Sequence, residues 1–581
     1  MIQTDRNEFR SSTTPEEQPP AKQQMAWLWA MSCCVIAFIL SILMSIAPLK
    51  RLVGSPFPWQ LPISKLLLVW GAWLPSDFHW LPNQHDSQVS TNNIEFLGLI
   101  ALAFAIYGLF ALLTRFQAKT ASNRRVLCLV WIGAIIVGLS FVFAPAMLSH
   151  DIFVYADYGR SIVVHHSNPY FVPPAAFTWD VITRLDDWKF ATAAYGPLWL
   201  YISALSALLS GDHPLRFVLA FRLLGFAAHL LNTWLVIRIL RTSGRSQRTI
   251  ALGALLYALN PLVLLESCLG GHNDILMVTF LLLGVLLCIR AEQRGFTKPI
   301  DYLPPIVAFT LAAMIKFTSM PLIIFFLVLL ARRTLYQASS DAQKSVALYW
   351  RPAILKVLFA GLTGGVLALA LYAPFWFGHS ISAIMQSFLS PPSALSAENS
   401  FLRTIQGWVH QHGLPARNSW VYTPLTVLNS HQAWNTINTV TLACAIIAGA
   451  IGLWRSPKTH TLALAALAAL GALLVVTPWF FAWYVTWIVG FAAASLSLPG
   501  NRLGHALAAF ALTFSITAFF TYLMNGQPVI GNSGALIPNL RTFGIPLLVF
   551  LIVLIVDACF SKLLRFRVKR QFKDRSFQLP D

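Results

Sequence analysis

Continuous apolar runs of about 20 residues recur along most of this 581-residue chain, and they constrain its fold more than any other feature. Such a run is long enough to cross the hydrocarbon core of a bilayer as one α-helix. The strands of a membrane β-barrel would instead alternate apolar and polar residues over short segments. The sequence therefore predicts an all-α polytopic membrane protein with short interfacial helices in its extracytoplasmic loops.

About 13 transmembrane helices are predicted, within a range of roughly 12 to 14. Two stretches account for the range. Residues 198–209 are short for a full crossing and are expected to form a re-entrant helix. Residues 304–330 are interrupted by Lys316 and Pro321, so they form either two short helices or one broken helix.

Charged residues are few and strongly biased towards basic types. Only 11% of the residues are charged, against roughly 25% in a soluble domain, and the formal net charge is +19. The basic residues gather in short loops at 115–125, 241–248, 290–298 and 332–344 and in the tail 562–575. This pattern favours a positive-inside bias and contact with anionic lipid over nucleic-acid binding. It predicts that both termini are cytoplasmic and that residues 149–195 lie on the opposite side.

Two acids lie where the apolar run 126–147 ends. They are Asp151 and, six residues later, Asp157. An acid at the mouth of a helix bundle is costly unless it is used. Both are candidate catalytic residues, and because residues six apart do not share a helix face, the two acids are expected to have different tasks. Asp151 suits a general base that takes a proton from a hydroxyl group, and the alternative is that it caps the following helix.

Further polar residues in the stretch 149–197 are candidates for contact with a substrate. They are Tyr155, Arg160, Asn168 and Tyr195. The turn at Asn168 and the helix start after Tyr195 are also explained by loop geometry alone. Asp186 and Asp187 are expected to be solvated rather than to bind a metal.

A second polar motif, Gly-Gly-His-Asn-Asp, separates two apolar runs at residues 270–274. The glycine pair permits a sharp turn with the backbone close to a ligand. His272, Asn273 and Asp274 are therefore candidates for binding a hydroxyl group or a phosphate, and a structural His–Asp cap is the alternative. Glu266 adds one more costly acid inside the preceding apolar run.

Three cations are candidates for contact with an anionic lipid group. Lys316 lies in the middle of an apolar run, and at a helix break it would meet a phosphate as a point charge. The alternative is a lysine at the end of a short helix that extends to the interface. Arg222 and Arg403 are further candidates.

Five motifs occur in order between residues 126 and 487. They are DIFVYADYGRSIVVHHSNPY (151–170), AYGPLW (194–199), LNPLVLLESCLGGHNDILM (259–277), the Lys316 segment and the pair Trp483-Tyr484 within an aromatic cluster. Together they resemble the membrane glycosyltransferases of the C-type superfamily. The pattern is most similar to the polyprenol-phosphate-mannose-dependent alpha-1,6-mannosyltransferases of bacterial lipoglycan synthesis.

The resemblance implies an inverting transferase that moves a sugar, expected to be mannose, from a polyprenyl-phosphate donor to a glycan or glycolipid acceptor. The reaction would occur on the extracytoplasmic face of the cell membrane, with Asp151 as the base. Inversion requires no enzyme nucleophile. Membrane lipid is an implied partner and nucleic acid is not. No cofactor is required by the sequence, although some members of the superfamily use a divalent cation.

Two features depart from the family pattern. The candidate loop follows the third predicted span, whereas the superfamily commonly has it after the first, and no proline directly precedes Trp483. The alternatives are a transporter or flippase of a lipid-linked glycan, and a transferase of another sugar, such as arabinose or glucose, or to a lipid or protein acceptor. The first of these usually shows an internal repeat, and none is found.

Six parts of the chain are expected on this interpretation. They are a disordered cytoplasmic tail (1–24), an N-terminal pair of spans with an interfacial segment (25–125), a catalytic transmembrane module (126–377) with a first outer loop (149–195), a second large outer loop (378–435), C-terminal spans (436–560) and a basic cytoplasmic tail (561–581).

Overall fold

The computed structural model describes residues 21–52, 87–116, 123–340, 347–389, 397–495, 502–524 and 540–559. Within these ranges the regular structure is helical, and a single parallel bridge joins Glu398 and Trp479. The prediction of an all-α polytopic protein is confirmed. Most of the predicted N-terminal tail, the centre of the interfacial segment and the basic C-terminal tail lie outside the described residues.

Eleven helices in the described ranges are long and apolar enough to cross a membrane. These candidate spans overlap α1 (Ala21–Leu52), α4 (Ser87–Phe116), α5 (Asn123–Val142), α8 (Pro214–Thr242), α11 (Asp274–Arg294), α13 (Pro321–Ser340), α14 (Ala347–Trp376), α18 (His431–Arg455), α19 (Thr459–Val476), α21 (Arg502–Thr517) and the helix Leu540–Cys559. A twelfth span is present if the bent pair Gln247–Ala258 and Pro261–Leu269 counts as one crossing. The total meets the lower end of the predicted range.

Three shorter apolar helices lie outside this count. They are α7 (Pro197–Ser210), α12 (Pro299–Ala313) and the segment Ala482–Ala494, which contains α20 (Thr486–Ala494). At about 1.5 Å per residue, each is too short for a hydrocarbon core of about 30 Å. Residues 304–330 are divided near Lys316 into two helices, which is one of the two expected arrangements, because α12 ends at Ala313 and a 3₁₀ turn (η3, Phe317–Ser319) leads into α13.

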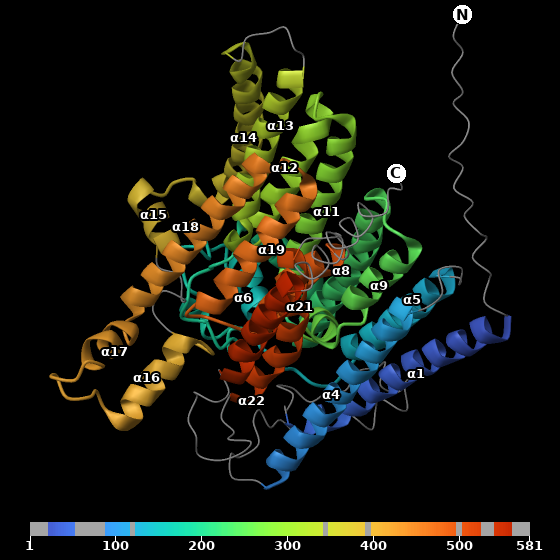
Figure 1. The fold of residues 1–581 in the computed structure, drawn as a ribbon. Helices are drawn as coiled ribbons and strands as arrows, with labels where there is room; N and C mark the ends of the chain where they lie inside the picture. The colour runs from blue at the N-terminus through green and yellow to red at the C-terminus, as the bar shows by residue number, and fades with distance from the viewer. Residues whose placement is uncertain are drawn as a thin grey trace, which may run out of the picture.

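The helices form a bundle in which early and late segments lie together. Contacts join α1 to α4 and α5, and α11 to α8, α12 and α20. Figure 1 shows α1, α4 and α5 along one side, and α12, α13 and α14 on the other. The helices α15 (Ile381–Leu389), α16 (Phe401–His412) and α17 (Tyr422–Leu428), all within the loop 378–435, project from the bundle (Figure 1).

Two backbone junctions join the long loops to the bundle. Gly196 and Leu198 donate their N–H groups to the carbonyls of Ile315 and Met314 at 3.0 Å, so the end of the loop 149–195 is fixed to the break before η3. A Cβ atom at Gly196 would lie 2.2 Å from the Met314 carbonyl oxygen, which explains the glycine. The bridge at Glu398 similarly fixes the loop 378–435 to the aromatic turn that begins near Trp479.

Candidate active site

Asp151 is the first residue of α6 (Asp151–Val163), directly after the turn that follows α5. The N-cap position belongs to His150, which makes no side-chain capping bond, so helix capping does not account for Asp151. The Ser149 hydroxyl accepts the Asp151 N–H at 3.2 Å, and the Tyr155 hydroxyl donates to its carboxylate at 3.3 Å. The side chain is 14% exposed, so the carboxylate is held by the protein and remains accessible.

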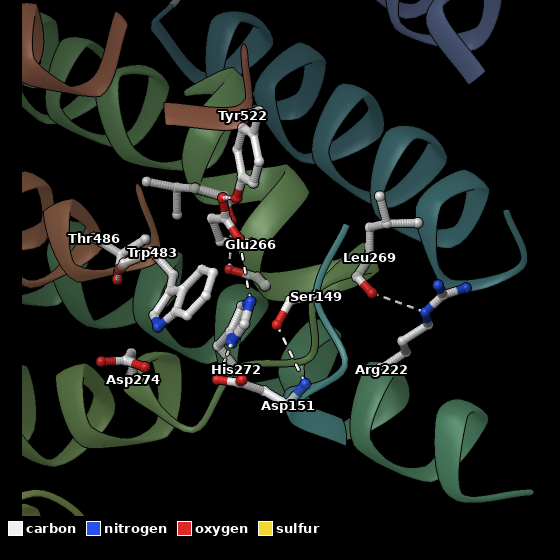
Figure 2. A network of polar contacts seen from close by, with 12 residues as sticks. Ser149, Asp151, Arg222, Glu266, Leu269, His272, Asp274, Trp483, Thr486 and Tyr522 are labelled. Carbon is white, nitrogen blue, oxygen red and sulfur yellow. Dashed lines mark hydrogen bonds and ion pairs between the residues drawn. The ribbon is translucent and has the colours of Figure 1, made fainter. Parts of the chain in front are cut away.

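His272 lies between two carboxylates. Its Nδ1 is 3.5 Å from Asp151 Oδ2, and its Nε2 is 3.3 Å from Glu266 Oε2 (Figure 2). The indole of Trp483 stacks on the imidazole, with ring centroids 4.0 Å apart and an interplanar angle of 14°. The stacked indole therefore fixes the orientation of the imidazole between Asp151 and Glu266.

The charges of Asp151, His272 and Glu266 stabilise one another. Burial lowers the pKa of His272, but the carboxylates of Asp151 and Glu266 outweigh burial and raise it to about 9. Burial raises the pKa of Asp151, but His272, Lys316 and Ser149 outweigh it and hold that pKa below its ordinary value. Near neutral pH, Asp151 is therefore an ionised carboxylate beside an imidazolium, and it can only accept a hydrogen bond or a proton.

The turn that carries His272 has an unusual local structure. A π-helical turn (η2, Leu265–Leu269) presents Glu266, and Gly271 follows with a left-handed φ of 61°. A Cβ atom at Gly271 would lie 3.2 Å from both Ile152 in α6 and the backbone of Phe221 in α8. The glycine therefore permits the close approach of three segments.

Arg222 joins the chain before Asp151 to the turn before His272. Its guanidinium, which is fully buried, donates to the carbonyls of Leu269 at 2.8 Å and Ala144 at 2.7 Å, and also to those of Val142 and Ala146. Figure 2 shows the arginine reaching Leu269 from α8. The structure thus places this predicted phosphate contact away from the cavities and uses its donors to fix the backbone.

Lys316 and Asp274 form an ion pair on the other side of Trp483. Lys316 Nζ lies 2.8 Å from Asp274 Oδ1 and 4.2 Å from the centroid of the Tyr484 ring. Trp487 Nε1 donates to the same Asp274 oxygen at 2.5 Å. Asp274 is fully buried, whereas the Lys316 side chain is 14% exposed. The lysine ammonium is therefore the accessible end of a buried, aromatic-lined pair.

Two cavities meet at Asp151. One has a volume of about 420 Å³ and the other of about 330 Å³. Both are lined by Asp151, Trp188, Phe481 and Trp483. The larger cavity is further lined by polar residues, including Ser149, His150, Asp187, Glu398, Asn399 and Tyr522. The smaller one adds Lys316, Tyr195, Tyr484, Trp487 and apolar residues such as Phe317, Leu473 and Leu474.

Asp157 faces away from both cavities. One of its carboxylate oxygens accepts the Thr183 hydroxyl at 2.7 Å, and its side chain interacts with that of Asp186. Burial raises the pKa of both acids, and the charge of Asp157 raises that of Asp186 further. We expected Asp186 and Asp187 to be solvated. This was wrong for Asp186, which is 2% exposed, because its side chain packs against that of Asp157.

The remaining predicted contacts are dispersed. Arg160 donates to Asp180 within the loop 149–195 and pairs with Asp212 after α7. Asn168 donates to the Phe375 carbonyl. Asn273 is buried beside His272, and Arg403 is exposed on α16 and lines neither cavity.

Several residues near Asp151 were not predicted from the sequence. Trp188 lines both cavities, and Glu398 and Tyr522 line the larger one. Trp188 carries no motif, and Tyr522 is one aromatic residue at the end of an apolar run. For Glu266, the one available signal in the sequence is an acid inside an apolar run. Within the described ranges, no group of three or more His, Cys, Asp or Glu side chains could hold a metal ion.

Comparison with known proteins adds a family likeness. Residues 63–332 match the model described as the N-terminal domain of the alpha-(1->6)-mannopyranosyltransferases. The matched part includes Asp151, Glu266, His272 and Lys316, and it ends before Trp483.

Three relatives carry the same description. The chain is 27% identical to alpha-(1->6)-mannopyranosyltransferase A of Corynebacterium glutamicum over 150 residues, which cover 26% of this chain and 30% of the relative. It is 31% identical to an alpha-(1->6)-mannopyranosyltransferase of Mycobacterium tuberculosis over 170 residues, 27% of each chain. It is 24% identical to a probable alpha-(1->6)-mannopyranosyltransferase of Mycolicibacterium smegmatis over 429 residues, 72% of this chain and 66% of the relative.

The alignments thus span about a third of the first two relatives and just under two thirds of the third. They confirm the resemblance seen in the motifs: this multi-pass membrane chain is similar to the alpha-(1->6)-mannopyranosyltransferases of mycobacteria and corynebacteria, and its residues 63–332 match their N-terminal domain.

Proposed function

We propose that the chain is an inverting glycosyltransferase that moves mannose from a polyprenyl-phosphate donor to a hydroxyl group of a glycan or glycolipid acceptor. The observation that carries this proposal is the position of the ionised Asp151 carboxylate where two cavities of different chemistry meet. A transferase must bring a donor and an acceptor to one base, and this arrangement provides a place for each.

The smaller cavity suits the donor. Its Lys316 ammonium offers a positive charge to a phosphate, and the apolar residues beside it suit a prenyl chain. The aromatic faces of Tyr484 and Trp483 are available to stack on a sugar ring. Lys316 remains bound to Asp274 in this arrangement, which holds the ammonium at the edge of the cavity.

The larger cavity suits a hydroxyl-rich acceptor. Glu398, Asn399 and Asp187 supply hydrogen-bonding groups along its wall. Among the described residues, His150 is the only basic side chain that lines it, so an uncharged glycan fits better than a second phosphate. We place this cavity on the extracytoplasmic side because the basic loops predict that α5 leads outwards.

The reaction needs one base and no covalent intermediate. Asp151 takes the proton of the acceptor hydroxyl while that oxygen forms a bond to the anomeric carbon. The bond from the anomeric carbon to the phosphate oxygen breaks, and its electron pair leaves on the phosphate. Lys316 stabilises the charge that develops there. The attack from the face opposite the leaving group inverts the configuration.

A transfer assay with the purified protein in nanodiscs tests the proposal. The donor is radiolabelled polyprenyl-phosphate mannose, and the acceptor is a short alpha-mannoside. We expect single-turnover transfer by the wild type and its loss in Asp151→Asn with the folded state intact. Absence of transfer by the wild type with mannose, arabinose and glucose donors would overturn the transferase proposal, and movement of the intact lipid-linked glycan across the bilayer would then identify a flippase.

A further inference from the structure

Trp188 lines both cavities but has no part in the transfer described above. It lies in the loop 149–195, and 36% of its surface is exposed. An indole offers a large apolar face together with one polar N–H group. Ligand sites are lined mainly by apolar and aromatic side chains, with a few polar groups that fix the orientation of the ligand. An accessible indole beside Asp151 therefore indicates a binding role.

The rings at the junction of the two cavities differ in their contacts. Trp188, Phe481 and Trp483 line both cavities together with Asp151. Phe481 and Trp483 stack on each other, with centroids 4.4 Å apart and an interplanar angle of 4°. The ring of Trp188 instead meets that of Trp479 edge to face, at 64° and 5.1 Å between centroids. This contact covers at most one face of the Trp188 indole, so a face remains for a ligand.

The backbone holds Trp188 in place. Its N–H group donates to Asp186 Oδ1 at 2.7 Å, and its carbonyl accepts the N–H group of Ala191 at 2.8 Å. The preceding residue, Asp187, pairs with His150 at 2.6 Å. A binding residue that is positioned before its ligand arrives loses little conformational freedom on binding. The loop thus presents a pre-organised indole.

Polar groups accompany the indole in the larger cavity. Asp187, Glu398 and Asn399 line that cavity and do not line the smaller one. An acyl chain placed there would bury these groups without hydrogen-bond partners, which is unfavourable. A pyranose suits both surfaces, since the C–H groups of its ring form an apolar face and its hydroxyls can bond to carboxylates and amides. The chemistry of this wall therefore fits a sugar ring.

Trp479 connects the indole to the polar wall. Its backbone forms the parallel bridge to Glu398, and its ring contacts that of Trp188. The backbone hydrogen bonds on either side of the bridge are both 3.0 Å long. The loops 149–195 and 378–435 thus meet at one residue, and this contact sets the position of Trp188 relative to that of Glu398.

We propose that Trp188 is the binding platform for the acceptor pyranose that carries the reacting hydroxyl group. This inference rests on the proposed transferase function and names the part of the acceptor that the larger cavity holds. One face of the sugar ring lies on the indole, and its hydroxyls bond to Glu398 and Asn399. Asp151 lines the same cavity, so the base is available to the reacting hydroxyl. Trp188 takes no proton and forms no bond, so it acts on acceptor affinity and not on the chemical step.

Three substitutions of Trp188 separate ring stacking from packing. Trp188→Phe keeps an aromatic ring, Trp188→Leu keeps an apolar side chain without a ring, and Trp188→Ala removes both. Trp179→Ala is the matched control, because Trp179 lies in the same loop, is 65% exposed and lines neither cavity. The proteins in nanodiscs are assayed with radiolabelled polyprenyl-phosphate mannose and a short alpha-mannoside, and the two concentrations are varied separately.

We expect Trp188→Ala to raise the KM for the acceptor about 10- to 100-fold, because the sugar loses its stacking surface. The KM for the donor and kcat at saturating acceptor should stay within about threefold. Trp188→Leu should behave like Trp188→Ala. Trp188→Phe should raise the KM for the acceptor only about 2- to 5-fold, since a ring face remains. Trp179→Ala should keep the wild-type values.

The outcomes separate this inference from the function on which it rests. No transfer by the wild type would refute the transferase function, and the platform with it. Transfer by the wild type with an unchanged KM for the acceptor in Trp188→Ala would overturn the platform alone, as would an equal rise in the KM for the donor. If Trp188→Ala does not fold, Trp188→Phe and Trp188→Leu decide. Equal acceptor KM values in these two variants would show that the position needs only apolar volume, which would also overturn the platform.

Discussion

The helix α6 carries two acids whose surroundings differ. Asp151 lies beside an imidazolium and faces two cavities, whereas Asp157 lies beside the carboxyl group of Asp186 and faces neither. A neighbouring cation keeps the first acid ionised, and burial next to a second acid keeps a proton on the other pair. The comparison shows that burial alone does not identify a base, because the neighbouring charge decides whether a carboxylate can accept a proton.

The largest expected effect distinguishes the two acids directly. Asp151→Asn should lower the transfer rate about 10²- to 10⁴-fold, which is the usual contribution of a general base. Asp157→Asn should keep the rate within about 10-fold, because it removes no cavity contact. Single-turnover transfer at saturating donor measures both. A greater loss in Asp157→Asn, with the protein folded, would reverse the roles proposed for the pair.

Lys316 gives the next largest effect. Lys316→Met should raise the KM for the donor about 10- to 100-fold, because the phosphate loses its cation. It should also destabilise the protein by about 3–5 kcal/mol, since the buried Asp274 is left unpaired.

The double variant Lys316→Met/Asp274→Asn separates these two effects. It should recover much of the thermal stability without recovering donor affinity. A recovery of donor affinity in the double variant would mean that the lysine acts only as the partner of Asp274.

Asp157 and Asp186 predict that the stability of the loop 149–195 depends on pH. The pKa values of Asp157 and Asp186 are raised in the folded protein, so their stabilising effect is complete below the ordinary carboxyl range and is lost as the pH rises through about 7 to 8. Hydrogen exchange of residues 151–195 should therefore accelerate over this interval by more than the intrinsic rise of amide exchange with pH. In Asp157→Asn the dependence should become weaker, and an unchanged dependence would exclude the pair as its source.

Arg403 should show the smallest effect. It is exposed on α16 and lines neither cavity, so Arg403→Ala should change donor KM by no more than about twofold. Steady-state assays with varied donor concentration measure this. A tenfold rise would place α16 on the path of the donor.

Local patterns allowed a good part of the fold to be predicted. Long apolar runs determine the spans, and the break at Lys316 follows from a charge and a proline in such a run. The polar turn at residues 270–274 was recognisable because it interrupts two apolar runs. The short length of the helix Ala482–Ala494 was harder to predict, since hydropathy alone does not give the end of a helix.

The candidate site was less predictable because its contacts join distant parts of the chain. The hydrogen bond between Tyr522 and Glu266 spans 256 positions, and the bond between Trp487 and Asp274 spans 213. Arg222 illustrates a second limit. An arginine in an apolar run must have a partner, but the sequence does not distinguish a ligand phosphate from backbone carbonyls.

The hydrogen bonds from Arg222 to the backbone have a mechanical consequence. Arg222 in α8 holds the end of α5 and the end of the π-turn through one rigid planar group. If bilayer thinning tilts α5, the chain before Asp151 and the chain before His272 are expected to shift as a unit. The distance between Asp151 and His272 would thus stay constant in membranes of different thickness.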